Sequence, residues 1–395
     1  MTALPTVRLA PGGHKRAELG SPWIYSNEIR MDKAAKDLAP GSLVRLEAAS
    51  GKKLGVATFN PHTLVAARLL DRDPERPIDA GFFAEKFAAS LALRQRFYPE
   101  PFYRLVHAEA DGLPGLVVDR FGDVLAVQLN TAGMNAREDD ILAALDTVLK
   151  PRAVMLRNDS TARKTEGLAA ETRVALGALD GPVEIAENGA RFLADPLTGQ
   201  KTGWFYDQRE NRRFVASLAS GASVLDLYCF GGGFAVTAAL RGARTVAAID
   251  RSDGALDLAR RAAELNGVAS ICRFERAEAF AYLEASARTG ARFDVVIADP
   301  PAFVKSRKDL GPGLKGYRKL ARLAASVTAP KGLLFLASCS HNVGVSDFAE
   351  AVGRGLVDAG RSSRILLSSG AAPDHPVHPA LPESAYLKAQ TLALD

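Results

Sequence analysis

The stretch from Val224 to Phe234 constrains the fold of this chain more than any other part of its sequence. Val224 and Leu225 are typical of a buried strand, and Asp226 lies at the carboxyl end of that strand. Three consecutive glycines then allow the backbone to turn sharply, and the apolar residues from Phe234 onward predict a helix. A strand, a glycine turn and a helix form the first unit of a nucleotide-binding α/β fold.

The residues of this turn favour one class of cofactor. The Gly-x-Gly-x-x-Gly motif of a dinucleotide site is absent, and an acidic residue precedes the glycines. That arrangement suits a cofactor with a cationic amine and no pyrophosphate, such as S-adenosylmethionine (SAM). Asp250 follows Asp226 by 24 residues, at the end of the next predicted strand. An acidic side chain at that point can accept hydrogen bonds from both ribose hydroxyls.

From Ser223 onward, strands and helices alternate as a doubly wound parallel sheet requires. The third predicted strand, Ile271 to Phe274, is followed by Glu278, whose carboxylate we expect to bind the adenine amino group. The fourth strand ends at Asp299, and the fifth runs into Cys339. Because the carboxyl ends of parallel strands share one edge, we expect these side chains to lie around one site.

Asp299 and Cys339 point to chemistry on a flat base. Asp299 precedes two prolines, which make a rigid turn. Amino-methyltransferases use a similar turn with an aromatic residue in fourth place, but here the fourth residue is Ala302 and Phe303 comes fifth. A Cys339 thiolate adding to cytosine C6 would make C5 nucleophilic enough to accept a methyl group. The other two cysteines, Cys229 and Cys272, are expected to be structural.

A basic segment follows the Asp-Pro-Pro turn. We expect it to be a loop, because glycines and a proline interrupt it, and we expect it to bind RNA phosphates and close on the substrate. Its cationic residues are Lys305, Arg307, Lys308, Lys315, Arg318 and Lys319.

Composition and charge exclude several classes of protein. Three cysteines without paired spacing argue against a disulfide framework and a zinc site, and no metal is expected. The sequence has neither a secretory leader nor an apolar run of membrane length, so a cytoplasmic location is expected. The net charge is +5, and residues 1–72, with eleven Lys/Arg and six Asp/Glu, carry all of the excess. A basic module on a neutral body suggests a nucleic-acid partner.

Residues 5–72 predict short strands joined by Gly and Pro turns, as in a small barrel. Lys15-Arg16, Pro22-Trp-Ile-Tyr-Ser and the Gly55 to Pro61 stretch resemble a PUA-type RNA-binding domain. The chain is similar to the PUA-domain class I SAM-dependent 23S rRNA (cytosine-C5) methyltransferases, of the ribosomal large subunit methyltransferase I type. The resemblance implies large-subunit ribosomal RNA, or a ribosomal particle, as substrate.

The same resemblance extends through the middle and the end of the chain. Asp111-Gly-Leu-Pro-Gly-Leu matches the family's middle α/β domain, and Asp374-His-Pro and Tyr386-Leu-Lys match its C-terminal part. We therefore expect a PUA-like domain at 1–74, a middle α/β domain at 75–180 and a Rossmann-like methyltransferase domain at 181–395. In the middle domain, Glu109, Asp111 and Asp119 are interpreted as solvated loop ends.

The family carries Lys-Thr-Gly and Asp-Gln-Arg in a segment lying over the cofactor. This chain has them at Lys201-Thr202-Gly203 and Asp207-Gln208-Arg209, and Asp207 is also a possible helix N-cap. The expected catalytic residues are Cys339 and Asp299. The expected RNA-binding residues are Lys15, Arg16, Lys305, Lys315 and Arg318. The expected cofactor-binding residues are Asp226, Tyr228, Phe230, Gly231, Gly233, Asp250, Arg251, Glu278, Asp299, Lys201, Thr202, Asp207 and Gln208.

Two other functions fit the sequence. One is an N-methyltransferase that uses Asp299-Pro-Pro on adenine or guanine and leaves Cys339 idle. The other is a non-catalytic RNA-binding assembly factor that keeps a SAM fold. The residue that removes the C5 proton also stays open among Asp299, His341 and water.

Overall fold

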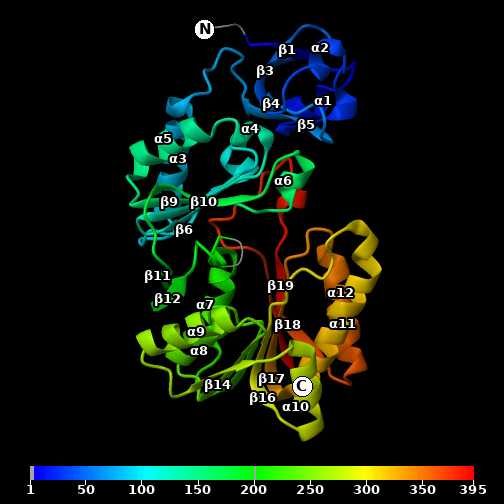
Figure 1. Ribbon diagram of the computed structural model, residues 1–395. Coiled ribbons are helices and arrows are strands. Elements are labelled where there is room, and N and C mark those ends of the chain that lie inside the picture. Colours follow the sequence, from blue (N-terminus) through cyan, green and yellow to red (C-terminus); the bar gives the residue numbers. More distant parts are fainter. Residues whose placement is uncertain (1–3, 200–201) are drawn as a thin grey trace. The chain divides into compact units, whose positions relative to one another are not determined.

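The computed structural model describes residues 4–199 and 202–395 (Figure 1). The chain forms two compact units. The first contains the chain through Val183, together with Asp195–Trp204 and Asp374–Pro382. The second contains Glu184–Ala194, Phe205–Pro373 and Glu383–Asp395. The chain therefore crosses between the units several times. None of the described helices is long and apolar enough to span a membrane.

The first unit begins with a five-stranded sheet in the order β1-β3-β4-β5-β2. Alternate strand residues such as Val44, Leu46 and Ile24 are fully buried in its core, as the alternation of apolar and polar residues predicts. The elements are β1 (Thr6–Arg8), α1 (Lys15–Glu18), β2 (Trp23–Tyr25), η1 (Ser26–Glu28), α2 (Lys33–Lys36), β3 (Ser42–Glu47), β4 (Lys53–Phe59) and β5 (Val65–Asp71).

A second five-stranded sheet follows in the same unit, in the order β10-β9-β8-β7-β6. Phe83 and Phe87 of α3 pack on one face of it, whereas Leu93 of the same helix is exposed. The edge strand β10 was not predicted. The elements are α3 (Ala80–Gln95), β6 (Phe102–His107), η2 (Ala108–Asp111), β7 (Leu116–Phe121), β8 (Val124–Leu129), α4 (Ala132–Asn135), α5 (Glu138–Leu149), β9 (Ala153–Asn158), α6 (Ala162–Thr165) and β10 (Glu171–Gly177).

The interpretation of the middle carboxylates as solvated loop ends is wrong. The Asp119 side chain is fully buried and forms a bidentate ion pair with Arg104, its direct cross-strand partner, with N–O distances of 2.8 Å. Asp111 forms a similar pair with Arg94 at 2.7 and 2.8 Å, and Glu109 accepts a hydrogen bond from the Trp23 indole at 2.9 Å. Sequence spacing did not reveal these partners because α3 and β6 bring the arginines from elsewhere in the chain.

The second unit contains a seven-stranded sheet in the order β15-β14-β13-β16-β17-β19-β18, in which β19 alone is antiparallel to β17 and β18. Its elements are β11 (Val183–Glu187), β12 (Ala190–Ala194), η3 (Tyr206–Gln208), α7 (Arg209–Ser217), β13 (Ser223–Leu227), α8 (Gly233–Leu240), β14 (Thr245–Asp250), α9 (Asp253–Leu265), β15 (Cys272–Arg276), α10 (Ala279–Thr289), β16 (Phe293–Ala298), η4 (Arg307–Asp309), α11 (Leu310–Val327), β17 (Thr328–Ser338), α12 (Val345–Asp358), β18 (Ser363–Ser369), η5 (Pro382–Ser384) and β19 (Lys388–Leu394).

Helices cover both faces of this sheet (Figure 1). Val224 packs on one side with Phe234 of α8 and Leu256 of α9. The next residue, Leu225, packs on the other side with Leu320 of α11. Both faces are buried, which explains why the parallel strands are continuously apolar. The doubly wound sheet predicted from residue 223 onward is confirmed.

The prediction of a basic loop after the Asp-Pro-Pro turn is wrong for most of its length. Residues 310–327 form the long helix α11. Pro312 lies in the first turn, where its missing N–H would have no helical partner. Gly313 allows close packing, because a Cβ there would lie 2.2 Å from Val304 Cγ2. The glycines that suggested a loop thus let the helix approach the segment that precedes it.

Candidate functional site

Four predicted site residues lie at one edge of the seven-stranded sheet. Asp226, Asp250, Asp299 and Cys339 stand at or just after the carboxyl ends of β13, β14, β16 and β17, which are mutually parallel. This edge of a doubly wound sheet is where such folds bind ligands. The structure therefore brings these four residues to the common edge that the sequence predicted.

Asp226 is a buried acid at this edge. It is 1% exposed, and its Oδ2 accepts a hydrogen bond of 3.0 Å from the backbone N–H of Ala235. Its Oδ1 has no hydrogen-bond partner among the described residues. Burial raises the pKa of Asp226 to about 8, and the negative charges of Asp299 and Asp250 add to this. A buried carboxylate oxygen without a donor fits a cationic amine that comes with a ligand.

The turn after β13 has a strained backbone. Tyr228, Phe230 and Gly232 adopt positive φ values of 63°, 49° and 79°. Such conformations cost about 1–3 kcal/mol at a non-glycine residue and cluster at functional sites. The Cys229 N–H donates to the Ile249 carbonyl at 3.0 Å and helps to hold the turn.

The glycines in this turn serve helix packing. Gly231 is buried, and a Cβ at Gly233 would lie 2.5 Å from Arg212 Nε. Arg212 in turn donates to Glu187 at 2.6 Å and to the Phe205 carbonyl at 2.8 Å. Phe205 packs edge-on against Phe230 with ring centroids 5.0 Å apart. Helix α7 and the segment before it therefore support the turn directly.

Asp250 and Glu278 lie at the ends of the neighbouring strands. The Asp250 carboxylate accepts backbone hydrogen bonds from Phe230 at 3.0 Å and from Ser252 at 2.9 Å, so it also holds the turn. Arg251 is exposed beside it. Glu278 is exposed at the N-cap of α10 and makes no capping hydrogen bond. Burial and the Glu278 charge both raise the pKa of Tyr228, which places the Glu278 carboxylate near this turn.

The Lys-Thr-Gly and Asp-Gln-Arg pieces fall in different compact units. Lys201 lies outside the described residues. Thr202 belongs to the first unit, where its hydroxyl donates to Asp119 at 2.5 Å. Asp207 does not cap α7, since Gln208 occupies the N-cap and makes no side-chain cap. Asp207 instead accepts a hydrogen bond of 2.5 Å from the Tyr386 hydroxyl, and Gln208 accepts one of 2.6 Å from Asn211.

Cys339 lies beside the Asp-Pro-Pro turn. It is partly exposed, and its thiol donates to the Pro300 carbonyl at 3.9 Å. Its neighbours Ser338 and Ser340 are fully buried and bond to the Tyr317 hydroxyl at 2.8 and 2.9 Å. Ser340 Oγ also accepts a hydrogen bond of 3.2 Å from the Val304 N–H, so the turns after β16 and β17 are fixed to each other.

The sequence did not identify Lys388 as a site residue. Lys388 opens β19 directly opposite Ser338 and is only 5% exposed. Its ammonium donates to the Ser340 and Val343 carbonyls, each at 2.7 Å. Burial lowers the pKa of Lys388, and Cys339 partly offsets this electrostatically. The sequence feature that could have indicated Lys388 is a single charged residue at the start of an otherwise uncharged strand.

The predicted RNA-binding cations differ in their pairing. Arg318 forms a bidentate ion pair with Asp358 at 2.5 and 2.7 Å, so its charge is offset. Lys305 and Lys315 are exposed and make no ion pair with the residues that the structure describes. In the first unit, Lys15 is exposed on α1. Arg16 next to it pairs with Glu28 at 3.6 Å, and its guanidinium lies 4.8 Å from the centroid of the Tyr25 ring.

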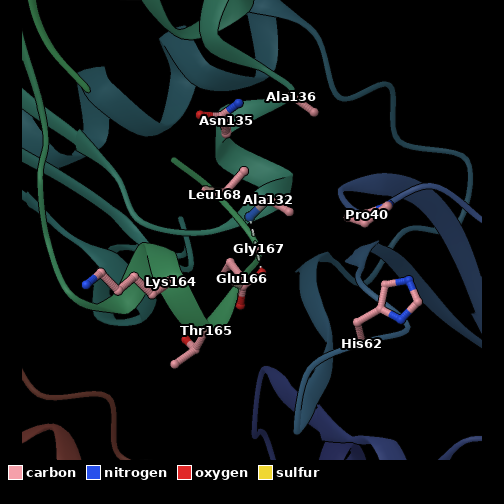
Figure 2. Close-up of a pocket in the computed structure, with 10 residues that line it drawn as sticks. All are labelled: Pro40, His62, Ala132, Asn135, Ala136, Lys164, Thr165, Glu166, Gly167 and Leu168. Carbon is pink, nitrogen blue, oxygen red and sulfur yellow. Dashed lines mark hydrogen bonds between the residues drawn. The ribbon is translucent and has the colours of Figure 1, made fainter. Parts of the chain in front are cut away.

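A separate pocket of about 510 Å³ lies in the first unit (Figure 2). The Glu166 carboxylate, which lines this pocket, is bound by other residues of the protein. It pairs with Arg68 at 2.7 Å and accepts hydrogen bonds from Asn60 at 3.0 Å and from the Ala132 N–H at 3.2 Å. The pocket contains none of the predicted site residues. Its lining residues are Pro40, His62, Ala132, Asn135, Ala136, Lys164, Thr165, Glu166, Gly167 and Leu168.

Family models match two parts of the chain. Residues 166–365 match S-adenosylmethionine-dependent methyltransferase, and residues 7–72 match the PUA-like domain. The second match confirms the predicted PUA-like domain. The Aeromonas hydrophila protein called ribosomal RNA large subunit methyltransferase I is 36% identical over 97% of this chain and 98% of its own length. The Erwinia tasmaniensis protein of the same name is 35% identical over 97% and 98%.

Solved structures share the fold. A Streptococcus mutans chain described as a SAM-dependent methyltransferase superposes with a TM-score of 0.82 at 22% identity, over 99% of this chain and 100% of its own. A methyltransferase structure complexed with SAH gives a TM-score of 0.83 with the same identity and coverage. These similarities support the fold over nearly the whole chain.

Proposed function

This chain belongs to the family of S-adenosylmethionine-dependent methyltransferases that includes ribosomal RNA large subunit methyltransferase I, and we propose that it forms 5-methylcytosine in 23S rRNA. The observation that carries the proposal is the position of Cys339. Its thiol lies at the carboxyl edge of the sheet, against the Asp299-Pro300 turn, on the same edge as Asp226 and Asp250. The proposed nucleophile for cytosine C6 and the proposed site for the methyl donor would thus share one edge of the sheet.

Asp226, Asp250 and Glu278 suit the three polar parts of SAM. The unpaired oxygen of Asp226 would accept from the amine, Asp250 would accept from the ribose hydroxyls, and Glu278 would bind the adenine amino group. Tyr228, Phe230, Gly231, Gly233 and Arg251 would line the turn around them. Within the second unit, Asp207 and Gln208 remain proposed contacts to the methionine part. Bound SAM supplies an electrophilic methyl group.

The proposed reaction uses Cys339 twice. Its thiolate forms a bond to cytosine C6, which raises the electron density at C5 so that C5 can take up the methyl group. A base then removes the C5 proton, the C6–S bond breaks, and the thiolate is restored. Asp299 would accept a hydrogen bond from the cytosine amino group and, when protonated, donate one to N3. Asp299, His341 and water remain candidates for the base. The target base must leave its stack to reach the thiol.

The PUA-like module and the exposed lysines suit an RNA substrate. Lys15, Arg16, Lys305 and Lys315 would contact phosphates, and Arg318 contributes less because Asp358 offsets its charge. Ribosomal RNA as substrate follows the names of the relatives, and it implies a cytoplasmic reaction.

The direct test of this function is the modification itself. We expect 23S rRNA from cells that lack the protein to lose one 5-methylcytosine, detected by mass-spectrometric mapping, and purified protein with SAM to restore it. An unchanged set of 5-methylcytosines would exclude the proposal. SAM binding without methyl transfer to any rRNA would favour a non-catalytic assembly factor.

The N-methyltransferase alternative is less well supported. It needs an aromatic residue stacked on the target base, but Phe303 packs against Tyr317 with ring centroids 4.7 Å apart. A Cβ at Gly316 would lie only 3.0 Å from the Phe303 ring, so α11 also contacts it. An N-methyltransferase would keep its activity in Cys339→Ala, whereas C5 transfer would be abolished.

A further inference from the structure

Lys388 is a buried ammonium with an unusual environment. Only 5% of the residue is exposed, and the two acceptors of its ammonium are the carbonyls of Ser340 and Val343, at 2.7 Å each. No carboxylate of residues 4–199 or 202–395 lies within ion-pair distance of Lys388. A buried charge without a counter-ion is costly, so such a lysine is expected either to lose its proton or to have an anion nearby.

The carbonyl contacts favour the protonated form. Each carbonyl oxygen carries a partial negative charge, so two of them at 2.7 Å from Nζ stabilise the ammonium relative to the neutral amine. The two carbonyls also belong to the turn that begins at Cys339. Lys388 therefore fixes the backbone that carries the thiol and places a positive charge beside it. The electrostatic effect of Cys339 on the pKa of Lys388 agrees with this proximity.

The other titratable groups on the packed elements do not supply this positive charge. Tyr317 on α11 interacts electrostatically with Cys339, but burial raises its pKa and keeps the phenol neutral. Asp299, in the turn after β16, is an acid and would oppose a thiolate. His341 stacks on the Tyr386 ring with ring centroids 5.1 Å apart. Among these groups, Lys388 is the one whose ammonium donates directly to carbonyls of the turn that carries Cys339.

We propose that Lys388 is a positioning residue that stabilises the thiolate form of Cys339. The inference rests on the proposed function, because it assigns a role in the activation of the proposed nucleophile. A nearby cation favours the charged form of a thiol and also favours a thiolate as a leaving group. Lys388 would therefore assist both the addition to C6 and the later release of the base, while the proton released from C5 goes elsewhere.

The test is the pH dependence of alkylation of Cys339 in the full chain, without RNA. Iodoacetamide labelling is followed by mass spectrometry of the peptide that contains Cys339, so Cys229 and Cys272 do not interfere. The midpoint is the pH at which the alkylation rate is half of its maximum. In the wild-type protein we expect this midpoint to lie clearly below the usual thiol pKa of about 8.5. A midpoint at or above that value in the wild-type protein overturns the inference without any variant.

Variants then assign the effect to Lys388. Lys388→Met should raise the midpoint by about one pH unit or more. The exposed Lys36→Met on α2 is the control, and it should leave the midpoint unchanged. If Lys388→Met fails to fold, Lys388→Gln keeps a donor for one carbonyl and removes the charge, and it should show the same shift. A folded Lys388 variant with the wild-type midpoint would overturn the inference.

Failure of this inference can be separated from failure of the proposed function. If Cys339→Ala retains methyl transfer while the wild-type thiol has a low midpoint, the proposed function fails and the role of Lys388 as a thiolate partner stands. If Cys339→Ala abolishes transfer but replacement of Lys388 leaves the alkylation midpoint unchanged, only the role of Lys388 fails.

Discussion

The Tyr386 hydroxyl donates a hydrogen bond of 2.5 Å to the carboxylate of Asp207. This contact joins the segment before β19 to the segment before α7, which sequence analysis associated with the cofactor. The Tyr386 ring also stacks on His341 at 5.1 Å, and His341 follows Cys339 by two residues. Within the second unit, Tyr386 thus connects the cofactor segment to the turn that carries the proposed nucleophile.

Tyr386→Phe should weaken SAM binding by about tenfold, because a hydrogen bond to a charged group contributes about 1.5–3 kcal/mol. Loss of the bond leaves Asp207 with one donor fewer and loosens the segment in which Phe205 supports Phe230. Isothermal titration calorimetry measures the affinity. Tyr282→Phe on α10 is the control and should bind SAM normally. Equal affinity of Tyr386→Phe and wild type would show that the contact does not support the cofactor site.

Asp226→Asn should stabilise the protein without cofactor at alkaline pH. The pKa of Asp226 is about 8 in the folded protein, against an ordinary 3.8, so the folded state holds the proton more tightly than the unfolded chain. The free energy of unfolding therefore falls as pH rises from about 4 to about 8. Asparagine does not titrate, so the variant escapes this destabilisation. Its free energy of unfolding at pH 8 should exceed that of the wild-type protein by about 1 kcal/mol or more.

Urea unfolding of both proteins at pH 5 and pH 8 measures this difference. The same variant should bind SAM about ten- to a hundredfold more weakly, since it lacks the charged acceptor for the amine. Parallel stability profiles for the two proteins would mean that Asp226 does not titrate in this range. Undiminished SAM binding would remove Asp226 from the cofactor site.

Gly313→Ala should destabilise the second unit by about 1–3 kcal/mol, because overpacking at a tight contact forces neighbours to move. The added Cβ would lie 2.2 Å from Val304 Cγ2, in the segment that follows the Asp-Pro-Pro turn. Gly311→Ala in the same helix is the matched control. No atom lies within 4 Å of the Cβ added at Gly311, so this variant should be as stable as the wild-type protein or up to about 1 kcal/mol more stable. Thermal unfolding distinguishes the two, and equal melting temperatures would contradict the packing role of Gly313.

Lys315→Ala should weaken binding to a 23S rRNA fragment and lower the slope of log K against log salt by about 1, as expected for one lost phosphate contact. Lys319→Ala on the same helix is the matched control, because Lys319 already pairs with Glu284 at 2.9 Å. Fluorescence anisotropy over a salt series gives both slopes. Identical slopes for the two variants would place Lys315 outside the RNA interface.

The parts of the site that could be predicted from sequence depend on short-range patterns. Asp226, Asp250, Asp299 and Cys339 each follow an apolar strand, and parallel topology alone brings strand ends to one edge. The PUA-like module was likewise identifiable from local motifs, and a family model confirms it.

The failures concern long-range packing. Glycines and a proline in residues 311–316 are typical of a loop, but in the structure they belong to α11. Its glycines allow the helix to pack closely against Val304 and Phe303. Asp119 looked like a solvated loop end because nothing near it in the sequence announces its partner Arg104. Lys388 meets the Cys339 turn only because β19 runs antiparallel to β17. Each error therefore reflects a partner that only the tertiary fold supplies.

The most direct measurement of the central claim is capture of the proposed covalent adduct. RNA that contains 5-fluorocytidine has no C5 proton to release, so a cysteine bonded to C6 should stay attached after methyl transfer. With SAM, the wild-type protein should form a complex with this 23S rRNA fragment that survives denaturing electrophoresis, and peptide mass spectrometry should place the bond on Cys339. A complete absence of covalent complex under conditions of active methyl transfer, or a bond mapped to another residue, would contradict the account.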